Sequence, residues 1–431
     1  MKRYDSYKDS GVKWLGEIPS HWEMLALKHI LKHKKEVVGK RSSQYDLLSL
    51  TLKGVIIRDM DNPEGKFPAS FDTYQIVEPN DFIFCNFDNE ETPRAVGLSQ
   101  YKGMITGAYD VLYRNNPLLS DKYLIYYFLY IDDSKRFKPL YKGLRKTVPF
   151  DSFMSYKIPV PSRGEQDAVV EYLDAVTSKI DEAIAQQQKM IDLLNERKQI
   201  IINNAVTKGL DPNVKMKPSG IDWIGDIPEH WEIRKLKTIV DKVGSGVTPR
   251  GGGSVYVDEG IMLLRSQNVY FEGFKLNDVA FITEAMDKEM GNTRVKEGDV
   301  LINITGGSIG RCHFVPKGFP RANVNQHVCI VRPRNFSSKY LYYLLRSNFC
   351  QLQVELQQTG GNREGLTSAA LKNFVLSIPP ENEQKKIIDY LDEKDKGLQY
   401  SIEICQKQIS LLQERKQIII NDVVTGKVKV V

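Results

Sequence analysis

Gly11-Val-Lys-Trp-Leu-Gly-Glu-Ile-Pro-Ser-His-Trp-Glu23 returns later in the chain as Gly220-Ile-Asp-Trp-Ile-Gly-Asp-Ile-Pro-Glu-His-Trp-Glu232. The two copies lie 209 residues apart and contain all four tryptophans of the 431-residue chain. Self-similarity at a fixed spacing indicates that one structural unit occurs twice. We call the parts of the chain that contain these two segments the heads, and we expect a duplicated architecture around them.

A second pair of repeats follows the heads. Glu196-Arg-Lys-Gln-Ile-Ile-Ile-Asn203 recurs as residues 414–421, and Glu165-Gln166 recurs as Glu383-Gln384, both at an offset of 218. Apolar residues at three-and-four spacing predict one long helix in each half, over about 165–205 and 383–423. The expected packing seams are Leu173, Val176, Ile180, Ala183, Met190, Leu194 and Ile201 in the first helix, and Leu391, Leu398, Cys405, Leu412 and Ile419 in the second.

A long helix with a narrow apolar stripe needs a partner, and the other copy is the obvious one. Because a compact chain must bring its second domain to the far end of the first helix, we expect an antiparallel coiled coil; the alternative is that each helix packs on its own domain. The regions between the repeats share only sparse landmarks. They combine strand-like runs, such as 81–85 and 300–304, with helices that Ser120 and Ser338 are expected to cap.

The predicted fold class is thus α+β: two globular domains, two long helices forming an antiparallel coiled coil, and a pseudo-two-fold internal repeat. The expected segments are a head (1–28), variable region 1 (29–157), a central repeated region with the first long helix (158–210), the second head (211–237), variable region 2 (238–377) and a C-terminal repeated region with the second helix (378–431).

Composition and motifs exclude several classes of protein. No apolar run reaches eighteen residues, and the first residues lack a signal-peptide core, so we expect a cytoplasmic protein without membrane contact. The five scattered cysteines predict free thiols rather than a zinc site or disulfides. There is no nucleotide-binding Gly-x-x-x-x-Gly-Lys-Ser/Thr loop, and the six histidines form no metal-binding pattern. We expect His21 and His230 to be packed structural residues, and we predict no catalytic residues, metal or cofactor.

Charge gives a weak indication of the partner. Net charge is +6 for the chain, about +3 for variable region 1 and +4 for variable region 2, but −2 for residues 162–208. An excess of positive charge on the variable regions favours contact with phosphates. Because the excess is small, it permits a polyanionic partner without requiring one.

Loops of the variable regions are rich in side chains that can read DNA bases. Arginine pairs with guanine, and asparagine or glutamine pairs with adenine, in the major groove. The candidate DNA-binding residues are Lys142, Arg145, Lys146, Thr248, Arg250, Arg265, Asn268, Arg311, Asn325, Gln326 and Arg363. Arg145 and Arg363 match between the halves, so we expect backbone contacts from them. The unmatched Thr248, Arg250, Asn268, Asn325 and Gln326 are better candidates for base contacts. The glycine-rich segment before Arg311 could contact a phosphate or form a tight structural turn.

These motifs together resemble the specificity subunits of type I restriction–modification systems. The resemblance rests on the paired Trp-x-Gly-x-Ile-Pro-x-His-Trp heads, the Glu-Gln…Tyr-Leu-Asp entries to the helices and the Glu-Arg-Lys-Gln-Ile-Ile-Ile-Asn ends, and on Gly298–Arg311 and Gly103–Tyr109 within the variable regions. It covers essentially the whole chain.

The resemblance implies a non-catalytic subunit whose two variable regions each recognise half of a bipartite site in double-stranded DNA, with the helices setting the spacer. It also implies two modification subunits, which methylate adenine with S-adenosylmethionine, and ATP-dependent restriction subunits. Two other hypotheses remain: a coiled-coil scaffold with two protein-binding globular modules, and a stand-alone methyltransferase or nuclease, whose motifs the sequence lacks.

Overall fold

The computed structural model describes residues 2–60, 68, 70–357 and 365–430. The chain divides into two compact units. Unit 1 contains residues 1–188 and 406–431, and unit 2 contains residues 189–405. Each unit therefore holds one head, one variable region and one end of each long helix.

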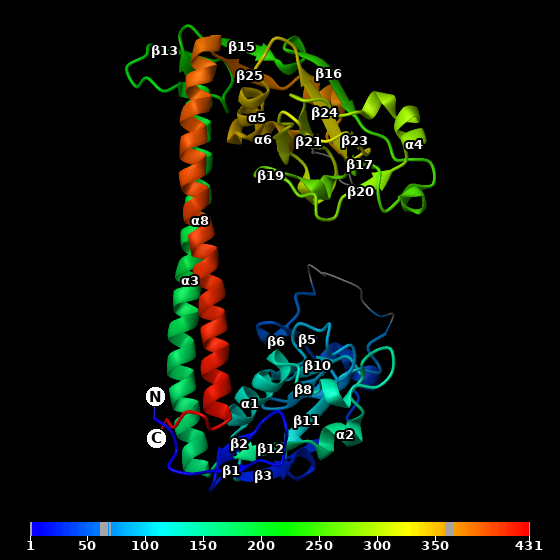
Figure 1. Cartoon of the computed structure of the whole chain (residues 1–431), viewed down its shortest axis with the longest axis vertical. Coiled ribbons are helices and arrows are strands. Elements are labelled where there is room, and N and C mark those ends of the chain that lie inside the picture. Colours follow the sequence, from blue (N-terminus) through cyan, green and yellow to red (C-terminus); the bar gives the residue numbers. More distant parts are fainter. Residues whose placement is uncertain (1, 61–67, 69, 358–364, 431) are drawn as a thin grey trace. The chain divides into compact units, whose positions relative to one another are not determined.

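The two long helices are α3 (Arg163–Lys208) and α8 (Glu381–Val424), as predicted. In unit 1 the beginning of α3 packs against the end of α8, in a cluster with Ile180, Ile184, Leu412, Ile419 and Ile420. In unit 2 the end of α3 packs against the beginning of α8, in a cluster with Ile202, Ala205, Val206, Ile387 and Leu391. Within each unit the helices therefore run in opposite directions, which confirms the antiparallel coiled coil (Figure 1).

The predicted seam of α8 is confirmed, because all five of its residues are buried or half-buried. The predicted seam of α3 is wrong at Met190, which is 49% exposed while Ile191 is 7% exposed. Lys198 also lies in this seam, buried, with its Nζ 2.8 Å from Asp395 Oδ1 of α8. Burial, together with the nearby charge of Arg346, lowers the pKa of Lys198.

Variable region 1 is built on a four-stranded antiparallel sheet in the order β4-β11-β8-β9. The strands span Leu31–His33, Asp110–Arg114, Phe82–Phe84 and Val96–Leu98. Two antiparallel strand pairs accompany it, β5 (Leu48–Thr51) with β6 (Gly54–Ile57) and β7 (Gln75–Val77) with β10 (Gly103–Ile105). Helices α1 (Asp121–Asp133) and α2 (Phe150–Ser155) complete the region, and Ser120 caps α1 as predicted.

Variable region 2 repeats this sheet in the order β16-β24-β21-β22. Its strands span Val240–Ser245, Val328–Pro333, Val300–Asn303 and Cys312–Phe314. Variable region 2 also contains a three-stranded sheet, β20 (Ala280–Ile282), β17 (Ile261–Leu264) and β23 (Ala322–Val324), and the pair β18 (Val269–Tyr270) and β19 (Gly273–Phe274).

The helices of variable region 2 are α4 (Glu284–Glu289), α5 (Ser338–Arg346), α6 (Asn348–Leu356) and α7 (Ser368–Lys372). We expected Ser338 to cap the helix that ends at Arg346; the cap of α5 is Ser337, whose side chain accepts from the amide of Tyr340. All five cysteines of the chain are buried free thiols.

Each variable region begins and ends at a two-stranded stem. In unit 1, β3 (Glu23–Ala26) pairs with β12 (Lys157–Val160). In unit 2, β15 (Glu232–Lys235) pairs with β25 (Val375–Ile378). The heads form a second matching pair of hairpins, β1 (Tyr7–Asp9) with β2 (Glu17–Pro19) and β13 (Met216–Pro218) with β14 (Asp226–Pro228). The backbone of a variable region thus enters and leaves at one place, between its head and its long helix.

Candidate nucleic-acid interface

A glutamate in the first turn of α3 fixes the head of unit 1. Glu165 lies 2.9 Å from His21 Nε2 and accepts a hydrogen bond of 3.4 Å from the indole of the fully buried Trp22. Burial opposes ionisation of this carboxyl group, but hydrogen bonds from His21, Trp22 and Ser162 outweigh it and hold the pKa of Glu165 below its usual value.

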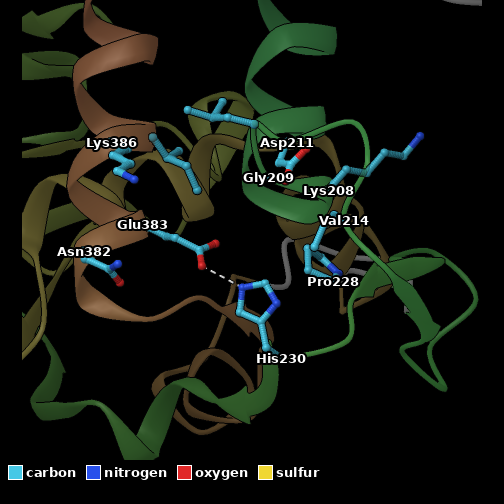
Figure 2. A pocket seen from close by; sticks show the side chains of 11 residues that line it. Lys208, Gly209, Asp211, Val214, Pro228, His230, Asn382, Glu383 and Lys386 are labelled. Atoms are coloured by element: carbon cyan, nitrogen blue, oxygen red, sulfur yellow. Dashed lines mark hydrogen bonds and ion pairs between the residues drawn. The ribbon is translucent and has the colours of Figure 1, made fainter.

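Glu383 of α8 makes the same two contacts in unit 2, and Figure 2 shows the one with His230. It lies 2.6 Å from His230 Nε2 and accepts a 2.9 Å hydrogen bond from the indole of Trp231. We expected His21 and His230 to be packed; instead their side chains are about half exposed, and their role is to pair with these carboxylates. A cavity of about 360 Å³ beside the pair is lined by side chains of both charges, among them Lys208, Asp211 and Lys386.

Each variable region is fixed to a long helix by an aspartate. Asp174 of α3 accepts hydrogen bonds from the Tyr126 hydroxyl at 2.7 Å and from Lys122 Nζ at 2.8 Å. The second unit repeats the arrangement on α8 with Asp392, Tyr343 and Lys339. Residues that match between the two halves therefore attach the variable regions to the long helices. The residues that differ between the halves lie elsewhere, on the surfaces that each variable region presents.

Three loops of variable region 2 meet at one edge, which we call loop edge 2 (residues 265–268, 304–311 and 325–327). Strands β17 and β23 are parallel neighbours, so the residues that follow them, Arg265 and Asn325, emerge side by side. The amide of Asn325 donates to the carbonyl of Leu264 at 3.0 Å, and the amide of Ile304 donates to the carbonyl of His327 at 3.0 Å.

Thr248 and three side chains of loop edge 2 form a continuous hydrogen-bonded row. The Thr248 hydroxyl donates to Gln326 Oε1, and Gln326 Nε2 lies 2.9 Å from His327 Nε2. The other ring nitrogen of His327 is hydrogen-bonded to the Thr305 hydroxyl. The structure therefore brings together two of the candidates, Thr248 and Gln326, which are 78 residues apart in sequence.

Cationic side chains stack on tyrosines beside this row. Arg311 lies 5.1 Å and Lys275 lies 4.0 Å from the centre of the Tyr270 ring. Arg265 lies 6.0 Å from the centre of the Tyr256 ring. Such stacking holds a guanidinium or ammonium group in place while it remains charged. Arg265 is also held by Asp278, because its Nη2 donates to the Asp278 carbonyl at 2.8 Å.

Two candidates in loop edge 2 are structural instead. Asn268 is 1% exposed, and its side chain bonds to the backbone of Arg265 and Lys275. Asn325 is 7% exposed, and its side chain accepts from the amide of His327. Both side chains are buried and bonded to backbone groups, so they shape the loops that carry Arg265 and Gln326 and present little surface to a base, which the sequence did not predict.

Variable region 1 displays different chemistry at the corresponding place, loop edge 1 (residues 85–92, 107–109 and 142–147). Arg145 pairs with Asp88 at 2.6 Å and lies 4.9 Å from the centre of the Phe87 ring. Phe87 in turn stacks on Tyr109, with 5.9 Å between ring centres. Tyr109 directly precedes β11, as His327 directly precedes β24.

The remaining candidates are less tightly placed. Lys142 and Arg250 are exposed. Lys146 pairs with Glu90 at 2.6 Å, and hydrogen bonds from Lys146 and Lys138 lower the pKa of Glu90 to about 2. Arg363 lies outside the described residues.

Sequence reasoning missed five side chains of these edges: Phe87, Tyr109, Tyr270, Thr305 and His327. The positions of two of them could have indicated a role, because Tyr109 and His327 each immediately precede a strand of the repeated sheet. Within the described part of the chain, no group of three or more His, Cys, Asp or Glu residues is arranged to hold a metal ion. No helix among those residues is both long and apolar enough to cross a membrane.

Comparison with known proteins gives a consistent result. Residues 228–410 match the family described as "Type I restriction modification DNA specificity domain". The chain is 26% identical to the type I restriction enzyme MjaVIII specificity subunit of Methanocaldococcus jannaschii, over 98% of this chain and 97% of that protein. It is 25% identical to the putative MjaX specificity subunit of the same organism, over 98% of each chain.

A solved structure supports the fold. It comes from work entitled "Structural basis underlying complex assembly and conformational transition of the type I R-M system", and it covers 95% of this chain and 99% of that chain with a TM-score of 0.65 at 14% identity. With heads, long helices and variable regions arranged as described above, the chain is similar over almost its whole length to type I restriction enzyme specificity subunits, and residues 228–410 match the DNA specificity domain of that family.

Proposed function

We propose that this chain recognises a bipartite site in double-stranded DNA, with variable region 1 reading one half and variable region 2 the other, and that it performs no bond chemistry itself. The observation that carries the proposal is a contrast: the contacts that hold the two variable regions to the long helices are alike, whereas loop edges 1 and 2 differ. Asp174 and Asp392 hold the two regions by the same contacts. Loop edge 1 carries an arginine on stacked aromatic rings, whereas loop edge 2 carries a row of polar side chains.

This contrast is what a reader of two different sequences requires. Because the same contacts hold both variable regions to the long helices, the two regions can approach a ligand in equivalent ways. Because the side chains of loop edges 1 and 2 differ, each region can select different base pairs. An enzyme duplicated for catalysis would instead repeat its reactive groups. We assign methylation and cleavage of DNA to separate modification and restriction subunits.

The test is a gel-shift assay with the chain bound to its modification subunits. It compares DNA that contains the sequence methylated by the assembled complex with DNA of scrambled sequence. We expect preference for the site and binding that weakens about a thousandfold or more between about 50 and 200 mM salt, because displaced counterions dominate phosphate contact. Equal binding to both DNAs at all salt concentrations, or binding to a protein partner only, would contradict the proposal and favour a protein-binding scaffold.

An exposed apolar pair that occurs once in each unit supports two copies of one partner. Leu193 and Ile200 of α3 are 50% and 49% exposed, and Leu411 and Ile418 of α8, at the same offset of 218, are 54% and 50% exposed. Residues seven apart lie on one face of a helix. Matching apolar pairs in two pseudo-equivalent places fit two modification subunits that bind alike.

We therefore expect the double variant Leu411→Ser/Ile418→Ser to bind one modification subunit in place of two, and Leu193→Ser/Ile200→Ser to do the same. Native mass spectrometry of the assembled complex gives the count. Tyr400→Ser is the control, because Tyr400 is also exposed, at 67%, but the matching position on α3 is Glu182. Two subunits bound by both double variants would rule out these pairs as the docking surface.

A further inference from the structure

Gln326 is the exposed centre of the hydrogen-bonded row in loop edge 2, and its neighbours use half of its hydrogen-bonding capacity. A carboxamide has two N–H donors and two oxygen lone pairs. The Thr248 hydroxyl takes one lone pair, and His327 Nε2 takes one N–H. One N–H and one lone pair remain for a ligand. The reverse orientation of the amide would leave the same two groups.

The row also holds the ring of His327. In this orientation of the amide, Gln326 Nε2 donates to His327 Nε2, and His327 Nδ1 lies against the Thr305 hydroxyl; the reverse orientation would exchange the donor and acceptor roles along the row. Thr305 follows β21 and His327 precedes β24, and these two strands pair with each other. The ring that orients Gln326 is thus held from the central strands of the sheet.

A glycine allows the Thr248 segment to approach this closely. A Cβ atom at Gly246 would lie 1.9 Å from the carbonyl oxygen of Val324 and 2.5 Å from that of Asn325. The segment 246–248 therefore lies against the backbone that carries Gln326 only because residue 246 has no side chain. The two sides of the Gln326 amide are held independently, by β16 through Thr248 and by β24 through His327.

We propose that Gln326, held between Thr248 and His327, recognises the adenine of an A·T base pair in the major groove. Adenine presents there an N7 acceptor beside an N6–H donor, which is the complement of one N–H and one lone pair. Guanine presents two acceptors and is the partner of arginine or lysine. An amide held on both sides loses little freedom on binding, which favours discrimination. The inference rests on the proposed function, and it specifies a base for that same edge.

The test uses the full chain with its modification subunits and a set of DNA duplexes that carry each of the four base pairs at every position of the site. We expect the wild-type complex to prefer A·T at one position of the half-site read by variable region 2, by about 5- to 150-fold. Gln326→Ala should remove this preference and leave the preferences at all other positions unchanged. Thr248→Val, which replaces the hydroxyl group of an exposed residue with a methyl group of similar size, should weaken the preference at the same position.

Gln413→Ala is the matched control, because it removes the same amide from an exposed position on α8. It should leave every preference intact. The inference is overturned if Gln326→Ala keeps the full pattern, weakens binding to all duplexes equally, or alters a position where the wild type prefers G·C. If the wild-type complex has no preference at any position, the proposed function itself fails, so the two failures are distinguishable.

Discussion

A chain in which residues 29–157 are replaced by residues 238–375 of the same protein is expected to recognise a site with two equivalent halves. The half read by variable region 2 should stay as it is, and the other half should change to the same base pairs. The physical reason is the stem. Lys157 pairs with Ala26 and Val375 pairs with Lys235, so the two regions begin and end at equivalent points of equivalent strands.

The transplanted region should also make the contacts that hold it to the long helix. Lys339 and Tyr343 would meet Asp174 in place of Lys122 and Tyr126. One contact needs a compensating change: Arg346, 2% exposed, lies 3.5 Å from Asp395, and the matching position on α3 is Thr177. The exchanged chain should therefore carry Thr177→Asp, because an unpaired buried guanidinium is costly.

Sequencing of DNA methylated by the assembled complex reads both halves at once. The reciprocal chain, with residues 29–157 in place of 238–375, is the control and should give the other symmetric site. If one exchange altered both halves, the two variable regions would not act independently. If neither half changed, DNA sequence would be read outside the variable regions.

Asp299→Ala is expected to have the largest effect on stability, about 3–5 kcal/mol. The carboxylate is fully buried and accepts from Arg332 at 2.7 and 2.8 Å and from the amide of Lys296 at 2.7 Å. An arginine cannot release its proton, so the variant would leave a mostly buried charge without its partner. Urea unfolding of the full chain, with amide hydrogen exchange read on β24, measures the loss.

Asp81→Ala is the matched control in variable region 1. Asp81 is 5% exposed and bonds to the amide of Glu78 in the same way, but its charged partner is Lys34, with a single contact of 2.9 Å. A lysine can turn away or lose its proton, so we expect a smaller loss, about 1–3 kcal/mol, read on β11. A loss at Asp81 equal to or greater than that at Asp299 would contradict this account.

Several features followed from short-range sequence patterns, and the structure agrees with them. The long helices α3 and α8 and their antiparallel pairing came from apolar spacing, and the seam of α8 is confirmed residue by residue. The wrong predictions occur where a sequence pattern fits either of two adjacent residues. Met190 and Ile191 both fit the three-and-four spacing around Leu194, and Ser337 and Ser338 can each cap a helix, so only packing and backbone direction select between them.

The sequence by itself determined the duplication, the helices, the fold class and the resemblance to type I specificity subunits, because repeats and periodic runs can be recognised without knowing which distant residues are in contact. The candidate site depended on tertiary structure. Nothing in a run of polar residues distinguishes Asn325, turned onto the backbone, from its neighbour Gln326, held toward solvent. Thr248 reaches Gln326 only because β16 pairs with β24 and Gly246 leaves room between backbones. Which side chains are free to bind is decided by which hydrogen bonds the folded chain has already used.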